Sequence, residues 1–194
     1  MRIGKVTEDR GLGYRNSSSG NRLGPNLAVP VVLSPNSYAL AFGNAFSVLG
    51  LLVRGWAAGS IDKDQELATS GPYAYLRNPL YLGTLLIGIG VTVAGGAGEW
   101  ILLFLAYFIA VYGMTMSLEH SRLTELFGQA YHEYASSVPS LIPRVVPYRP
   151  SRDSVGFSFR FKRYYRNKEW EAALGVLAMF SFLAIRAIFG WLGP

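Results

Sequence analysis

The residues best suited to chemistry lie in two polar segments that border the most apolar part of the chain. The first contains the turn signal Gly71-Pro72, followed by Arg77, Asn78 and Pro79. Because proline favours the first position of a helix, Arg77 and Asn78 are predicted to lie at a helix N-terminus. Free N–H groups and the helix dipole suit such a place to a carboxylate or phosphate. The structural alternative is that Arg77 and Tyr81 only anchor a membrane helix at head-group depth.

The second segment begins with Glu119 and His120, where a long apolar run ends. An ionisable residue at the end of a membrane span is a candidate site residue. The alternatives are an ion pair of Glu119 with Arg77 or Arg122, and a histidine that is merely solvated. Apolar residues then recur at helical spacing over 123–134, which predicts an amphipathic helix along the membrane surface.

The elements that must position these residues are membrane helices. Residues 80–118 carry one formal charge, Glu99, and the glycine-rich turn at 94–98 divides them into a helical hairpin. Two further spans are predicted over 38–58 and 170–191, with Arg54 snorkelling at the end of the first. The predicted fold class is all-α, a polytopic membrane helix bundle of about four transmembrane helices plus a cytoplasmic amphipathic helix.

Four regions are predicted: a mobile polar tail over 1–26, a membrane core over 27–147, a basic aromatic linker over 148–169, and a C-terminal transmembrane helix over 170–194. Residues 119–169 contain nine lysines and arginines, whereas the 94–98 turn contains none. The positive-inside rule therefore predicts that both chemical segments face the cytoplasm. The tail carries five basic residues, so the side of the membrane on which it lies stays open.

Composition excludes several classes of protein. Of the 194 residues, 15% are charged, against about 25% in soluble domains, and 51% are hydrophobic, which argues for a membrane protein. There is no cysteine, which rules out thiol catalysis and disulfides, and two histidines make a His-rich metal site unexpected. No metal is therefore predicted.

The net charge of +6 is expected to serve the membrane surface. Residues 157–168 interleave aromatic and basic side chains beside the last predicted span. Such a composition can stack on nucleic-acid bases, but its position beside the bilayer favours anionic lipid head groups. No nucleic-acid partner is predicted.

The two segments also carry a family pattern. Gly71-Pro72-Tyr73, Arg77-Asn78-Pro79 and Tyr81-Leu82-Gly83, followed one hairpin later by Glu119 and Phe127-Gly128, resemble the isoprenylcysteine carboxyl methyltransferases and the related phospholipid methyltransferases. The resemblance covers about residues 40–144. It implies an integral membrane enzyme that uses S-adenosyl-L-methionine without a Rossmann fold and methylates a small apolar or lipid-like acceptor.

The resemblance also implies a cytoplasm-facing cofactor pocket and its residues. Arg77 and Glu119 are predicted as the catalytic pair, with Glu119 on the methionyl ammonium and Arg77 on the carboxylate. The predicted cofactor-binding residues are Gln65, Glu66, Leu67, Ala68, Tyr73, Asn78, Pro79, Tyr81, Glu119 and His120.

Three departures from the family pattern bear on the acceptor. Asn78 stands where the prenylcysteine branch has histidine, His120 stands in place of a second acid, and residues 114–117 lack that branch's arginine. Two alternatives are an NADPH-dependent membrane reductase of the sterol reductase type, because such reductases have a similar Arg-x-Pro-x-Tyr-x-Gly string, and a non-enzymatic membrane scaffold.

Overall fold

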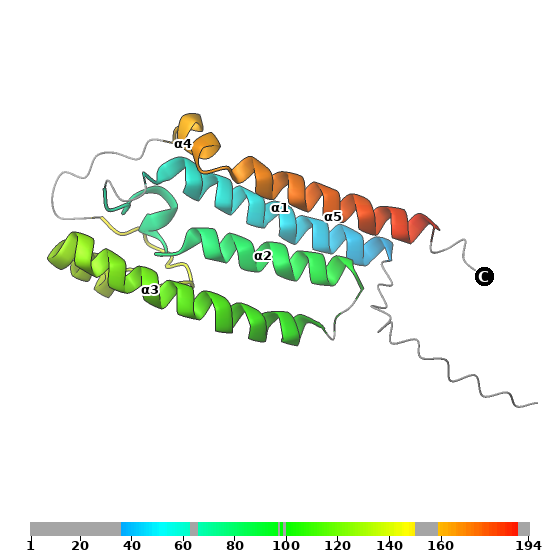
Figure 1. Ribbon diagram of the computed structural model, residues 1–194, viewed down its shortest axis with the longest axis horizontal. Coiled ribbons are helices and arrows are strands. Elements are labelled where there is room, and N and C mark those ends of the chain that lie inside the picture. The colour runs from blue at the N-terminus through cyan, green and yellow to red at the C-terminus, as the bar shows by residue number, and fades with distance from the viewer. Residues whose placement is uncertain (1–35, 63–65, 97, 99, 150–158, 190–194) are drawn as a thin grey trace, which may run out of the picture. The chain divides into compact units, whose positions relative to one another are not determined.

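The computed structural model describes residues 36–62, 66–96, 98, 100–149 and 159–189. These residues form helices and connecting segments, with no strand among them. Figure 1 shows the elements, whose bounds are α1 Ser37–Ser60, the 3-10 turn η1 Gly71–Ala74, α2 Pro79–Ala94, α3 Trp100–Ser137, α4 Phe161–Arg166 and α5 Glu169–Phe189. The predicted all-helical class is confirmed.

Among the described residues, three helices are long and apolar enough to cross a membrane: α1, α3 and α5. They agree with the predicted spans at 38–58 and 100–118 and, as far as Phe189, with the span at 170–191. The fourth predicted span, α2, is shorter than expected because its helix ends at Ala94, where Gly95 and Gly96 turn the chain. Its 16 residues extend about 24 Å at 1.5 Å per residue. The predicted tail over 1–26 and the first residues of the predicted membrane core, 27–35, lie outside the described residues.

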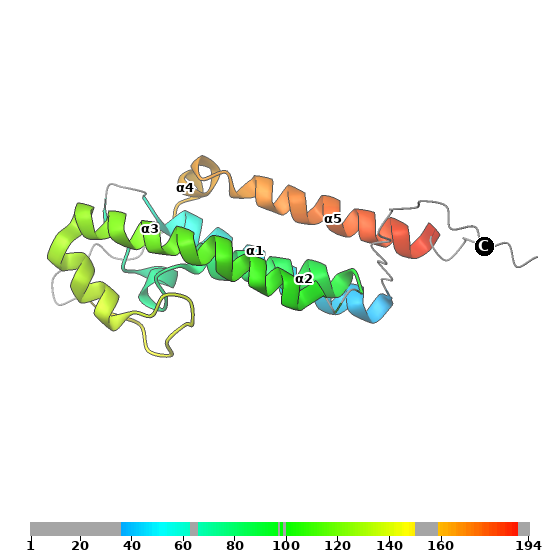
Figure 2. The same ribbon diagram turned by 60° about the horizontal axis from the view of Figure 1, so that its bottom comes forward.

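The predicted amphipathic helix over 123–134 is wrong as a single, separate element. Residues 119–127 continue α3, and Gly128 breaks the helix with φ 52° and ψ −125°, a conformation that suits a residue without Cβ. Figure 2 shows α3 bending sharply at this end. The apolar spacing continues across the break, since residues on both sides of it are buried together. Leu123 and Phe127, before the break, pack against the buried cluster that Tyr131 and Tyr134 form after it.

Close backbone contact joins α1 to α2. A Cβ atom added at Gly90 would lie 2.5 Å from the carbonyl oxygen of Gly43 and closer still to Ser47 Oγ. Small residues let helices approach in this way inside a bilayer, where dispersion contacts replace the hydrophobic effect as the driving force. α2 is thereby fixed against the first span, and its N-terminus is fixed with it.

This contact gives a prediction. Gly90→Ala should lower the free energy of unfolding in detergent by about 1–3 kcal/mol, because the added methyl overpacks the α1–α2 contact. Gly175→Ala in α5 is the matched control, since a Cβ there meets nothing within 4 Å. Thermal or denaturant unfolding of both variants checks the result, and equal stabilities would contradict it.

A partly buried ion pair attaches α5 to the first two helices. Arg54 Nε and Nη2 donate to the two carboxylate oxygens of Glu169, each at 2.9 Å, and Arg54 Nη1 donates to Thr84 Oγ1 at 2.6 Å. Glu169 is 7% exposed. The predicted snorkelling of Arg54 is therefore wrong: its guanidinium turns inward, where a bidentate partner satisfies the charge.

Glu169→Gln should consequently destabilise the protein by about 3 kcal/mol, because Arg54 would keep a charge without its counter-charge. Glu171→Gln, the same change two residues along α5, should have little effect. The side chain of Glu171 is more than half exposed, and its ion pair with Lys168 is long, at 3.8 Å, and open to solvent. Melting temperatures of the two variants test this difference, and an equal loss in both would exclude the ion pair as its cause.

Candidate functional site

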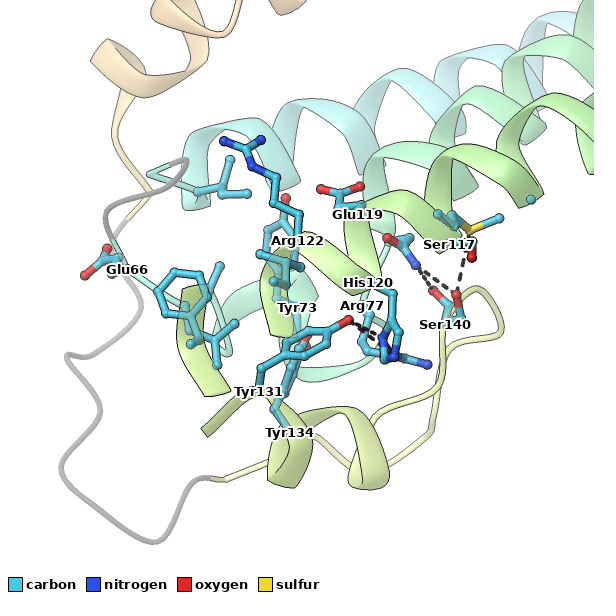
Figure 3. Close-up of a pocket in the computed structure, with 18 residues that line it drawn as sticks. Glu66, Tyr73, Arg77, Ser117, Glu119, His120, Arg122, Tyr131, Tyr134 and Ser140 are labelled. Carbon is cyan, nitrogen blue, oxygen red and sulfur yellow. Dashed lines mark hydrogen bonds between the residues drawn. The ribbon is translucent and has the colours of Figure 1, made fainter. Parts of the chain in front are cut away.

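A cavity of about 510 Å³ lies beside the N-terminus of α2 and the polar end of α3. Figure 3 shows its lining side chains. Four parts of the chain contribute to it: the segment after α1, the segment from η1 to α2, α3 around Glu119, and the chain after Gly128. The lining residues are Ile61, Glu66, Leu67, Ala68, Tyr73, Arg77, Asn78, Gly113, Met116, Ser117, Glu119, His120, Arg122, Leu123, Phe127, Tyr131, Tyr134 and Ser140.

Backbone hydrogen bonds hold the segment from η1 to α2 in place. Arg77 N–H donates to the carbonyl of Pro139 at 2.9 Å, and Asn78 N–H donates to that of Ser140 at 3.0 Å. The Asn78 amide Nδ2 adds a bond to Ser140 Oγ at 2.8 Å. Asn78 is the N-cap of α2 and Pro79 follows as its first residue, so the predicted helix N-terminus is confirmed. The chain after α3 therefore fixes Arg77 and Asn78 from outside their own segment.

Glu119 lines the cavity from α3. Tyr81 OH donates to Glu119 Oε2 at 2.9 Å, across from α2 to α3. Arg77 and Glu119 form no ion pair in the part of the chain that the structure describes. The purely structural Glu119–Arg77 pair considered from sequence is thus wrong, and Glu119 retains acceptor capacity toward the cavity.

Arg77 meets a different pair of side chains. Its Nη1 atom lies 3.4 Å from His120 Nδ1 and 3.4 Å from Tyr131 OH, and these two partners are 2.9 Å apart. Because arginine cannot accept a hydrogen bond, the contact to His120 Nδ1 is made with Nδ1 as acceptor. The Arg77 Nε atom is buried without a hydrogen-bond partner. A buried donor without a partner is costly.

Tyr73 supplies a second buried group of this kind. Its hydroxyl has no hydrogen-bond partner, while its carbonyl accepts from Tyr134 OH at 2.7 Å. Burial, with the Tyr134 phenol and the Glu119 carboxylate nearby, raises the pKa of Tyr73 far above its ordinary value. The phenol therefore keeps its proton at every physiological pH and is available as a donor.

The unpaired Tyr73 hydroxyl predicts that one substitution has opposite effects on the stability of the ligand-free protein and on its affinity for a ligand. Tyr73→Phe should leave the ligand-free protein as stable as the parent, or slightly more so, because it removes an unsatisfied buried polar group. The same change should weaken a ligand that accepts from the hydroxyl by about tenfold, the effect of one hydrogen bond. Melting temperatures with and without ligand separate the two effects. A loss of stability without ligand would contradict the first half.

Most of the predicted site residues meet in this cavity, but not all. Glu66, Leu67, Ala68, Tyr73, Arg77, Asn78, Glu119 and His120 line it. Pro79 and Tyr81 do not line the cavity. Pro79 is buried as the first residue of α2, and Tyr81 contributes indirectly, by donating a hydrogen bond from α2 to the Glu119 carboxylate. Gln65 lies outside the described residues. Glu66 lines the wall, yet its carboxylate binds Arg163 at 3.2 Å and is engaged outside the cavity.

Several lining residues were not predicted as site residues. Helical spacing predicts a single apolar face that contains Leu123, Phe127, Tyr131 and Tyr134. The residue that separates the first two from the last two is Gly128, where α3 bends sharply (Figure 2). Ser140 carried no signal, because a lone serine after a Val-Pro pair is common in loops. Over the described stretches of the chain, no group of three or more His, Asp or Glu side chains is placed to hold a metal ion.

Comparisons with known proteins support the resemblance drawn from the sequence. A family model described as phospholipid methyltransferase matches residues 38–130, which include the first chemical segment and the second as far as Ala130. Over 88 residues the chain is 33% identical to a protein-S-isoprenylcysteine O-methyltransferase of Schizosaccharomyces pombe, covering 45% of this chain and 37% of that protein. Over 133 residues it is 30% identical to the cobalt-zinc-cadmium resistance protein CzcN of Cupriavidus metallidurans, covering 66% of this chain and 60% of that protein.

This chain therefore spans just over a third of the first relative and three-fifths of the second. No solved structure matches it. The family match ends at residue 130, so Tyr131, Tyr134 and Ser140 of the cavity lie beyond it, as do α4 and α5.

Proposed function

From the premise that this chain is related to the phospholipid methyltransferases through residues 38–130, we propose that it is an S-adenosyl-L-methionine-dependent membrane methyltransferase. The acceptor is a small apolar or lipid-like molecule. The observation that carries the proposal is the cavity itself, which is lined by the Glu119 carboxylate and the Arg77 guanidinium, two groups that form no ion pair with each other within the described residues.

The residues present fit the cofactor. Its amino-acid end carries an ammonium and a carboxylate, and the cavity offers Glu119 for the first and the Arg77 guanidinium, with its unpaired Nε, for the second. Leu67, Leu123 and Phe127 provide apolar surface for the adenine ring. A volume of about 510 Å³ is in the range of small-molecule sites.

The bound cofactor supplies a methyl group on an already activated sulfonium, so the protein needs no metal and no nucleophilic side chain. The chain's own work is to align the reactants and exclude water. Tyr81 holds the Glu119 carboxylate, His120 and Tyr131 hold Arg77, and the bonds from Asn78 to Ser140 close the wall around them. The anchoring groups come from the start of α2, from α3 on both sides of Gly128 and from the chain after α3, which restricts the motion of the site.

The surroundings of the cavity support a membrane-derived acceptor at the cytoplasmic side. Met116 and Gly113 belong to the apolar part of α3, so an apolar acceptor can approach Glu119 from the bilayer. The excess of lysine and arginine over 119–169 supports a cytoplasmic location of the cavity.

The other candidate functions receive less support. The family match favours methyl transfer over an NADPH-dependent reductase. A non-enzymatic scaffold leaves the unpaired Tyr73 hydroxyl and Arg77 Nε without a purpose that offsets their cost.

Ligand binding by the purified protein tests the proposal. In detergent, S-adenosylmethionine and S-adenosylhomocysteine should each raise the melting temperature, since ligand at a hundredfold excess over Kd stabilises by about 2.7 kcal/mol. NADPH should not. A shift with NADPH alone would refute the proposal, and no shift with any of the three would favour the scaffold. Transfer of a labelled methyl group to extracted membrane lipids would then identify the acceptor.

A further inference from the structure

A second, apolar groove lies between α1 and the short helix α4, and only its α1 side falls within the family match. Its volume is about 400 Å³, and it is lined by Leu51, Leu52, Gly55, Trp56, Phe159, Phe161 and Tyr164. It shares no lining residue with the cavity described above. Leu52 and Trp56 belong to the membrane-spanning helix α1 and are exposed, so the groove opens on the surface that faces lipid.

The groove is held by defined contacts. The Phe159 ring lies directly over Gly59, where a Cβ would clash with it, and the Tyr164 ring lies beside Gly55, where Cε2 would be 3.5 Å from a Cβ. Backbone N–H of Arg160 donates to the Gly59 carbonyl at 3.0 Å, and Asn167 Nδ2 donates to that of Ala58 at 2.8 Å. α4 is thus attached to the end of α1 at both of its own ends.

The segment that forms the α4 side of the groove is strongly basic. Residues 159–168 carry five basic side chains and no acidic one. Arg163 and Arg166 bind Asp62, and Arg163 also binds Glu66. Arg160 and Lys162 are exposed and form no ion pair within the described residues. An apolar groove at the lipid surface, flanked by two such cations, suits a molecule with an apolar chain and an anionic head.

We propose that the groove between α1 and α4 is a binding site for an anionic phospholipid. One acyl chain lies in the groove against Trp56, Phe161 and Tyr164, and Arg160 and Lys162 bind the phosphate. The aromatic rings supply dispersion contact for the chain, and the two cations select the head group. This lipid is not the methyl acceptor, because its groove is separate from the Glu119 cavity, so the site stands whether or not methyl transfer does.

Trp56 provides a direct probe of this site. With Trp100, Trp170 and Trp191 changed to Phe, the full chain is placed in phosphatidylcholine bilayers that contain a minor fraction of lipid brominated on its acyl chains. Brominated phosphatidylglycerol should quench Trp56 fluorescence at roughly tenfold lower mole fraction than brominated phosphatidylcholine, from two cations near the head group. Equal quenching by the two lipids would overturn the proposal.

Two sets of variants separate the chain contact from the head-group contact. Gly55→Leu fills the groove and should abolish the preferential quenching, whereas Gly175→Leu, where a Cβ has open space, should not. Arg160→Gln with Lys162→Gln should leave quenching by phosphatidylcholine intact and remove the preference for phosphatidylglycerol. If Gly55→Leu or the double variant behaves like the parent while melting at the same temperature, the site is not in this groove.

Discussion

Glu119→Gln is expected to weaken S-adenosylmethionine binding by roughly a hundredfold, because it removes the carboxylate that faces the ligand's ammonium while preserving shape. Tyr81 OH can still donate to the glutamine side-chain oxygen, so the local hydrogen bond survives and the loss reports the charge. Isothermal titration of the detergent-solubilised protein measures the change.

Glu125→Gln is the matched control for this variant. Glu125 lies on the same helix, one and a half turns further on, and is exposed outside the cavity. It should bind the ligand as the parent does. Parent-like affinity in Glu119→Gln, with Glu125→Gln also unchanged, would remove Glu119 from the cofactor site and with it the main electrostatic argument for methyl transfer.

Arg77→Ala should cause a loss of similar size, about 10- to 100-fold in affinity, the effect of a hydrogen bond to a charged group. The variant removes the proposed carboxylate partner and also releases His120 and Tyr131, which contact Arg77 Nη1. Arg77→Lys restores the charge but not the Nε donor or the planar fork, so an intermediate affinity is expected.

Comparison with Arg149→Ala identifies the cause of that loss. Arg149 is exposed and does not line the cavity, so its removal should change neither affinity nor melting temperature. If Arg77→Ala binds the cofactor normally, or if Arg77→Lys binds it as tightly as the parent, the proposed role of the guanidinium is wrong.

The sequence predicted the first part of this site well for a geometric reason. A helical hairpin returns the chain to the side from which it started, so residues just before α2 and just after the apolar part of α3 must lie near each other. Tyr73, Arg77, Asn78, Glu119 and His120 meet in one cavity on this account. Family resemblance supplied their expected roles, which periodicity alone does not give.

What the sequence did not predict depends on single backbone events and long-range pairs. The reversal at Gly128 brings Tyr131 against His120, and helical spacing gives no sign of it because both halves share one apolar face. The bonds from Arg77 and Asn78 to Pro139 and Ser140 connect two irregular segments, for which no periodicity exists. Arg54 was predicted to snorkel because Glu169, its partner, is 115 residues away.

The ion pairs between α4 and the segment after α1 join parts of the chain that are synthesised far apart. Glu66 lines the cavity and Asp62 lies four residues before it, and their partners Arg163 and Arg166 follow 97 and 104 residues later in the chain. During synthesis the ribosome therefore delivers the hairpin and its charged residues well before α4. Until α4 emerges, the ion pairs to Glu66 and Asp62 cannot form, so we expect a nascent protein to bind the proposed cofactor less tightly than the finished chain.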